Sequence, residues 1–106
     1  MEVYLKVNFK KVLNLPKVGY QIIGTIKEVK GFCNKGHKVG DKIDLDCHDS
    51  GGLCGFFYHD IFPNLMMLQF GGGFPDSWVE DPDVMELECP DRINAVKIEL
   101  RRIKEK

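Results

Sequence analysis

Only one stretch of the chain has apolar residues at the spacing of an α-helix, and this limits the folds that the sequence can adopt. Over residues 53–68, apolar residues recur every three or four positions, as on one face of a helix. They are Leu53, Phe57, Ile61, Leu65 and Leu68. Each pair of parallel strands needs a crossover connection, usually a helix, so one long helix does not suit a doubly wound parallel sheet. We therefore predict an α+β fold in which one main helix covers a small, mostly antiparallel sheet.

We predict about five strands for this sheet. Apolar and polar residues alternate along four of them, and the stretch 20–29 is rich in β-branched and aromatic residues. Such alternation is typical of strands that are buried on one face. The stretches are residues 2–10, 20–29, 42–47, 84–89 and 95–103. In the third of them, Ile43, Leu45 and Cys47 share one face, which predicts that Cys47 belongs to the core.

The limits of the helix are predicted from capping residues and helix breakers. Asp49 or Ser50 can act as the N-cap. Pro63 lies inside the apolar pattern, so we expect a kinked helix or a restart with Pro63 in a new first turn. The three glycines at 71–73 are expected to end the helix.

The length of 106 residues corresponds to a single domain, residues 1–106. We assign residues 1–19 to an N-terminal strand extension and loop, and residues 20–103 to the core of the domain. The chain carries 15 basic and 16 acidic residues, which argues against nucleic acid as a partner because a nucleic-acid interface needs a basic excess.

The sequence also favours a cytoplasmic protein without a membrane partner. Charged residues interrupt every apolar run near the N-terminus, so no signal peptide is expected. The longest aliphatic and sulfur-containing run, residues 65–68, is far too short to span a bilayer. Four cysteines are too few for a disulfide scaffold, and reduced thiols are typical of the cytoplasm.

Cysteine and histidine residues form the most informative candidate site. Cys33 and His37 are four residues apart on an irregular segment, so both can reach one metal ion. Cys54 and Cys89 would complete a tetrahedral site of three sulfurs and one nitrogen, which suits zinc or iron. The alternative is an interaction or structural domain in which these thiols are buried, reduced and chemically idle.

Cys54 has a further interpretation because it lies near the start of the expected helix. The unpaired N–H groups and the dipole at that end favour a thiolate, which could act as a nucleophile or redox sensor. His37 is then the better candidate for the neighbouring base, since His59 would lie on another face of the helix. The sequence leaves open whether the protein is an enzyme, and it identifies no small-molecule ligand.

Several short motifs occur together in the chain. They read Gly31-Phe32-Cys33, Gly36-His37-Lys38-Val39-Gly40-Asp41, Gly52-Leu53-Cys54, Phe62-Pro63, Gly71-Gly72, Phe74-Pro75, Cys89-Pro90-Asp91 and Glu99-Leu100-Arg101-Arg102. Together they resemble a family of short uncharacterised prokaryotic proteins with three cysteines in this setting, and the resemblance covers residues 20–103. It implies no activity, only which positions matter: Cys33, His37, Gly40, Asp41, Cys54, Cys89 and Asp91. Cys47 does not match the motif.

Aromatic residues cluster in sequence after the helix. Phe70, Phe74 and Trp78 either cover the core or form a subunit contact, and the second interpretation predicts a homodimer.

Overall fold

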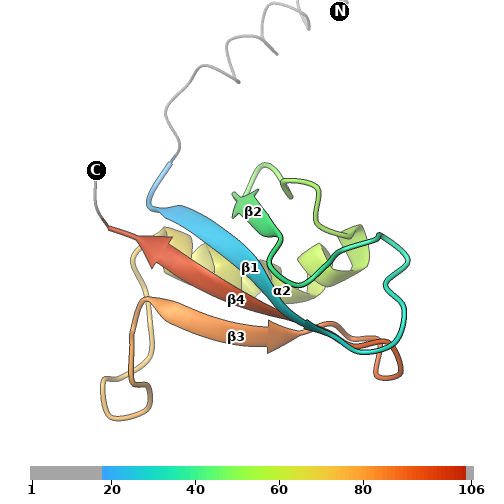
Figure 1. Ribbon diagram of the computed structural model, residues 1–106. Coiled ribbons are helices and arrows are strands. Elements are labelled where there is room, and N and C mark those ends of the chain that lie inside the picture. Colours follow the sequence, from blue (N-terminus) through green and yellow to red (C-terminus); the bar gives the residue numbers. More distant parts are fainter. Residues whose placement is uncertain (1–17, 105–106) are drawn as a thin grey trace, which may run out of the picture.

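The computed structural model describes residues 18–104, which form a four-stranded antiparallel sheet and one α-helix (Figure 1). The elements are β1 (Gln21–Val29), β2 (Lys42–Leu45), α2 (Gly55–Gln69), β3 (Val84–Glu88) and β4 (Val96–Ile103). The strand order is β2-β1-β4-β3, with every pair antiparallel. The predicted α+β class is confirmed, with four strands instead of about five. The remaining predicted strand, residues 2–10, lies outside the described residues.

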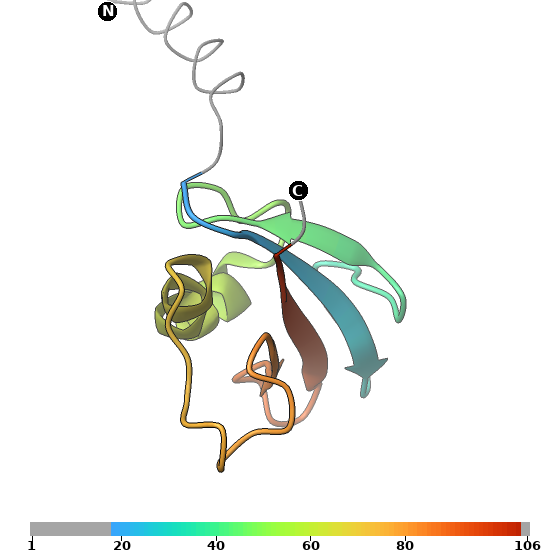
Figure 2. The same ribbon diagram turned by 90° about the vertical axis from the view of Figure 1, so that its left-hand side faces the viewer.

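Helix α2 packs against one face of the twisted sheet, and the core lies between them (Figure 2). In β4 the predicted alternation places every second side chain on this face, and β1 adds Ile22 and Ile26. The core residues are Ile22, Ile26, Ile43, Leu45, Leu53, Phe57, Ile61, Leu65, Leu68, Val96, Ile98 and Leu100. Gly24 in β1 permits this packing, because a Cβ atom there would lie 2.8 Å from Cδ1 of Ile98 and 2.9 Å from Cδ1 of Leu45.

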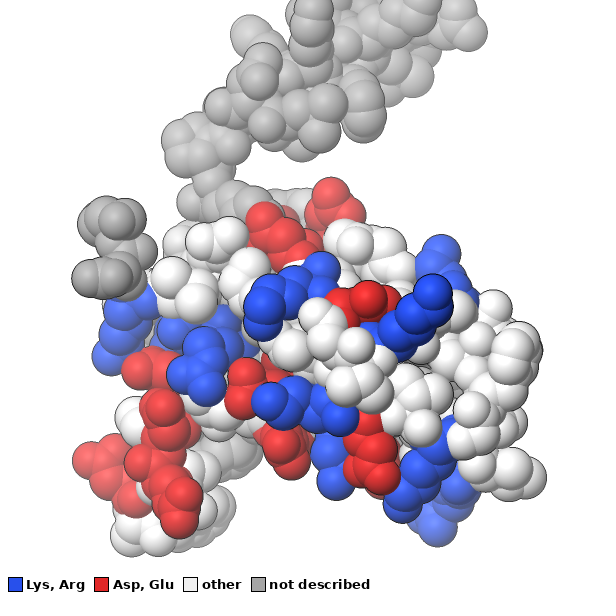
Figure 3. All heavy atoms as spheres, in the orientation of Figure 1, with Lys and Arg blue, Asp and Glu red and all other residues white. Residues whose placement is uncertain are grey.

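The opposite face of the sheet carries charged side chains of both signs, which are intermixed in Figure 3. Cross-strand pairing contributes to this pattern, since Lys97 Nζ lies 3.6 Å from Glu28 Oε1. Beyond the sheet, the loop after α2 exposes three aromatic side chains, Phe70, Phe74 and Trp78. Within residues 18–104, no helix combines the length and apolar content that a bilayer crossing requires.

The helix starts later than the sequence pattern indicates. Its first residue is Gly55 and its N-cap is Cys54, so the prediction of Asp49 or Ser50 as the N-cap is wrong. Residues 49–53 form turns because Gly51 and Gly52 adopt φ values of 64° and 95°, which a right-handed helix does not allow. The side chain of Asp49 instead accepts a hydrogen bond from the N–H of Gly51 at 2.8 Å.

Pro63 lies inside α2, and the helix continues through it instead of restarting. Both Pro63 and His59, whose carbonyl would accept the missing hydrogen bond, are solvent-exposed, so water can replace the lost partner. The helix ends at Gln69, and the glycine segment follows it as predicted. Gly71 has φ of 90° and donates to the carbonyl of Leu68 at 3.2 Å.

Strand β2 ends at Leu45, which makes the predicted core position of Cys47 wrong. Asp46 and Asp49 exchange two backbone hydrogen bonds of 3.0 Å and so close a tight turn. Cys47 and His48 occupy the middle of this turn, and the strand alternation stops before them. Cys47 is therefore half-buried outside the apolar core.

A buried arginine joins the end of β4 to the loop after the helix. The Arg102 guanidinium donates from Nε to Asp83 Oδ1 at 2.8 Å, from Nη1 to the carbonyl of Gly72 at 2.7 Å, and from Nη2 to the carbonyl of Pro82 at 3.1 Å. Its Nη1 also reaches the carbonyl of Leu68 at 3.0 Å, near the end of the helix. The single guanidinium thus fixes the path of the loop that connects α2 to β3.

This contact predicts an acid-sensitive contribution to stability. The hydrogen bond from Arg102 lowers the pKa of Asp83 below its ordinary value. Because the folded-state pKa is the lower one, the contribution is fully present above the unfolded value of about 3.9 and is lost as the pH falls through the folded-state pKa. We expect urea titrations below about pH 4 to show a steeper loss of stability for the wild type than for Asp83→Asn. The exposed Asp76→Asn variant is the control, and identical pH profiles for Asp83→Asn and the wild type would contradict the prediction.

Candidate thiol and metal sites

A cavity of about 70 Å³ lies where three segments meet, and all four predicted ligands line it. Cys33 and His37 come from the loop between β1 and β2, Cys54 comes from the start of α2, and Cys89 follows β3. The sequence prediction that these residues belong to one region is consistent with this arrangement. The rest of the wall contains Phe32, Asn34, Lys35, Phe56, Phe57, Asp91, Asn94 and Val96.

The loop that carries Cys33 and His37 is shaped by turns at both ends. The carbonyl of Cys33 accepts a hydrogen bond from the N–H of Gly36 at 2.9 Å, which folds the chain back just before His37. At the far end, Asp41 Oδ2 accepts from the N–H of Lys38 at 2.9 Å. The N–H of Gly40 donates to the carbonyl of Ile26 at 2.8 Å and returns the chain to β1.

The turn after Cys89 is held by Asp91 and linked to the first loop by Asn94. Asp91 Oδ1 accepts from the N–H groups of Ile93 and Asn94, each at 3.0 Å, and these hydrogen bonds lower the pKa of Asp91. Asn94 Oδ1 accepts from the N–H of Phe32 at 3.0 Å. Gly31 has φ of 75° and a Cβ there would clash with Asn94 Oδ1, so a glycine is needed for this link. The segments of Cys33 and Cys89 are thus joined.

Cys54 meets His37 at the start of the helix. As N-cap residue, Cys54 has no side-chain capping hydrogen bond, and its N–H donates to His37 Nε2 at 3.3 Å. This hydrogen bond requires an unprotonated Nε2 and therefore the Nδ1–H tautomer. Burial lowers the pKa of His37, nearby Asp41 raises it, and Lys35 lowers it further. His37 thus lies beside the backbone of Cys54, and its neutral imidazole can act as a ligand or a base once Nε2 is released from this hydrogen bond.

The cavity residues are close together but are not a preassembled metal site. Cys33, Cys54 and Cys89 carry free thiols, are half-buried, and pack against the apolar core. Among the described residues, only one group of three metal-ligating side chains has its ligand atoms within 4.8 Å of one another, and that group lies outside the cavity. Ligand atoms on one tetrahedral zinc ion are about 3.4 to 3.8 Å apart, so a metal ion in the cavity would need its walls to move closer.

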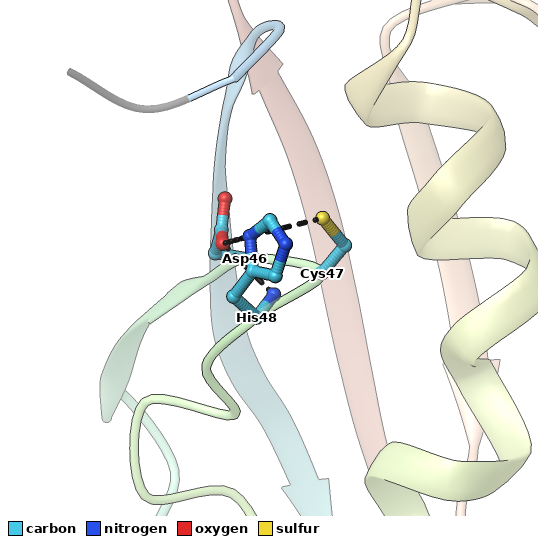
Figure 4. A group of neighbouring side chains, drawn as sticks. All are labelled: Asp46, Cys47 and His48. Carbon is cyan, nitrogen blue, oxygen red and sulfur yellow. Dashed lines mark hydrogen bonds and ion pairs between the residues drawn. The ribbon is translucent and has the colours of Figure 1, made fainter. Parts of the chain in front are cut away.

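That other group consists of the consecutive residues Asp46, Cys47 and His48 at the turn after β2 (Figure 4). His48 Nδ1 lies 3.4 Å from Asp46 Oδ2 and 3.6 Å from Cys47 Sγ. The N–H of His48 also donates to Asp46 Oδ2 at 2.9 Å. The imidazole therefore lies between a carboxylate and a thiol, a set of donors that can bind zinc.

Buried partners from the helix hold this turn in place. Gln69 is completely buried, and its Nε2 donates to Asp46 Oδ1 at 2.7 Å while its Oε1 accepts from the N–H of Cys47 at 2.9 Å. Tyr58 donates its hydroxyl to the carbonyl of Asp46 at 2.6 Å. Burial raises the pKa of Tyr58, as do the nearby Cys47, Asp46 and Asp49, so the hydroxyl remains a donor.

The sequence analysis does not predict this second group, because it places Cys47 in the core as the next residue of the alternation of Ile43 and Leu45. The available signal was the run of three metal-ligating residue types, Asp46, Cys47 and His48, just before a turn rich in glycine. A turn lets consecutive side chains converge, whereas a strand sends them to opposite faces.

Comparison of the chain with protein-family models, with curated proteins and with solved structures found no match. The resemblance to the short prokaryotic family therefore stays a prediction.

Proposed function

We propose that the protein is a small metal-binding module in which Cys33, Cys54, Cys89 and His37 hold one zinc or iron ion. The observation that carries this proposal is that all four side chains, from three separate segments, line one cavity. Three thiolates and an imidazole are soft and borderline donors, which suits either metal. The free thiols also fit a reducing compartment, and we propose a cytoplasmic location.

Binding in this cavity requires a small closure of its walls. Among the described residues, no three ligand atoms at this cavity lie mutually within 4.8 Å, so they must move closer to share one ion. The segment from Asn34 to Gly36 is solvent-exposed, so it can move inward with little loss of buried contacts. Metal binding is then coupled to ordering of the loop, and the metal stabilises the folded chain.

A second function, thiol chemistry at Cys54, is supported by its position as N-cap beside His37. Reactive cysteines are found at helix N-termini and beside histidines, and Cys54 has both features. An interaction domain with idle thiols is the third alternative, because all three sulfurs contact the apolar core. The exposed Phe70, Phe74 and Trp78 would suit a subunit contact in a homodimer.

We expect zinc to stabilise the wild-type protein and to do so much less in Cys33→Ser and Cys89→Ser. At a free zinc concentration of 100 times Kd, the free energy of unfolding should rise by about 2.7 kcal/mol. Loss of one thiolate should weaken binding by at least about tenfold, since loss of an outer partner alone costs about 10- to 100-fold. Denaturant titrations with and without zinc, under reducing and anaerobic conditions, measure both effects.

His59→Ala, which removes an exposed histidine outside both sites, is the control for nonspecific zinc binding. Equal zinc stabilisation of the wild type and both cysteine variants would exclude the cavity as the metal site. Rapid alkylation of Cys54 in metal-free protein would then favour thiol chemistry, and slow alkylation would favour the interaction domain.

A further inference from the structure

We propose that Asp46, Cys47 and His48 form a second metal site, which binds Zn²⁺ through three protein ligands and leaves its fourth position open. This site shares no residue with the cavity that Cys33, Cys54 and Cys89 line. It goes beyond the proposed function, because the site exists whether or not the cavity binds a metal.

The distances between the donor atoms agree with those on a tetrahedral zinc ion. With bonds of about 2.0 Å to nitrogen, 2.1 Å to oxygen and 2.3 Å to sulfur, tetrahedral angles separate nitrogen from oxygen by about 3.3 Å and nitrogen from sulfur by about 3.5 Å. His48 Nδ1 lies 3.4 Å from Asp46 Oδ2 and 3.6 Å from Cys47 Sγ. Two of the three distances between donor atoms therefore match those on a zinc ion, and the third, between Asp46 and Cys47, is within 4.8 Å.

The carboxylate is also held as a metal ligand requires. Asp46 is only 8% exposed, and its Oδ1 accepts a hydrogen bond from the buried Gln69, which leaves Oδ2 facing His48. Hydrogen-bonded outer partners of this kind fix the orientation of ligating carboxylates. The same Gln69 accepts from the N–H of Cys47, so one side chain positions two of the three ligands.

The exposure of the group leaves solvent free to supply a fourth ligand. The His48 side chain is 73% exposed, while the Asp46 carboxylate lies on the protein side of the group. Three protein ligands with a position open to water are the arrangement of zinc sites that bind an exchangeable ligand, whereas structural zinc sites use four protein ligands. The geometry thus points to a site that takes water or an external anion as its fourth ligand.

Zinc binding by His48→Ala and Cys47→Ala tests this inference on the full chain. Equilibrium dialysis at micromolar zinc under reducing conditions should give one zinc ion fewer per chain than the wild type, or an affinity at least about tenfold lower at this site. His59→Ala should retain the wild-type stoichiometry. If only the cavity site failed to bind zinc, Cys33→Ser and Cys89→Ser would bind as much zinc as the wild type. His48→Ala and Cys47→Ala would still bind less.

A variant that fails to fold would also bind less zinc, so a second measurement uses only the wild-type protein. In the wild type, zinc should shift the imidazole NMR signals of His48 and leave those of the exposed His59 unchanged. Unchanged His48 signals at saturating zinc, or wild-type stoichiometry and affinity in both variants, would overturn the inference.

Discussion

Replacement of Arg102 by methionine will lower the free energy of unfolding by about 3 kcal/mol or more. Arg102 is only 8% exposed, and its guanidinium donates to the carbonyls of Leu68, Gly72 and Pro82. Methionine fills much of the same space but donates no hydrogen bond, so these acceptors and the Asp83 carboxylate lose their partner. The Leu68 carbonyl is buried, and a buried polar group left without a partner costs about 1–3 kcal/mol. The lost hydrogen bond to the charged Asp83, which is partly buried, adds about 1.5–3 kcal/mol.

Urea titration of Arg102→Met against Arg101→Met measures this effect. Arg101 is the neighbouring residue on the same strand, but it is exposed, so its replacement should change stability by no more than about 0.5 kcal/mol. Equal stability of the two variants would show that the guanidinium does not hold the loop between α2 and β3.

Replacement of Gln69 by leucine will destabilise the protein by a similar amount, about 3 kcal/mol. The Gln69 side chain is completely buried and bonds three segments: the carbonyl of Val18 at 2.7 Å, Asp46 Oδ1 at 2.7 Å and the N–H of Cys47 at 2.9 Å. Leucine keeps the volume but leaves all three groups unpaired.

The matched control is Gln21→Leu, because Gln21 is exposed and its single side-chain hydrogen bond, to Asp44, is 3.5 Å long. Its stability should stay within about 0.5 kcal/mol of the wild type. A Gln69→Leu variant as stable as Gln21→Leu would mean that the buried amide does not order the turn at Asp46.

The sequence predicts best the parts of the fold that depend on burial of one face. The strands β1 and β4 and the body of α2 follow their apolar patterns, because each buries one face against the other layer. The predicted start of α2 is wrong because Gly51 and Gly52 favour turns more strongly than Asp49 favours an N-cap position. Arg102 lies at an inward position of β4, but no sequence pattern shows that a buried guanidinium will find four oxygen partners there.

Of the two candidate sites, one follows from the sequence and the other does not. Cys54 and Cys89 lie at the ends of elements and Cys33 lies in a loop, where segments meet, so their position in one region could be predicted from the sequence. The group of Asp46, Cys47 and His48 was not predicted, because these side chains converge only if β2 ends at Leu45. The turn that Asp46 and Asp49 close ends the strand, and its long-range partner Gln69 lies more than twenty residues further along the chain.

The most direct test of the cavity site is zinc X-ray absorption spectroscopy on the His48→Ala variant, in which the second group has lost a ligand. One equivalent of zinc bound by Cys33, Cys54, Cys89 and His37 will give three sulfur neighbours at about 2.3 Å and one nitrogen at about 2.0 Å. A first shell of oxygen and nitrogen neighbours only, or with a single sulfur, would contradict the assignment of these four residues as the ligands.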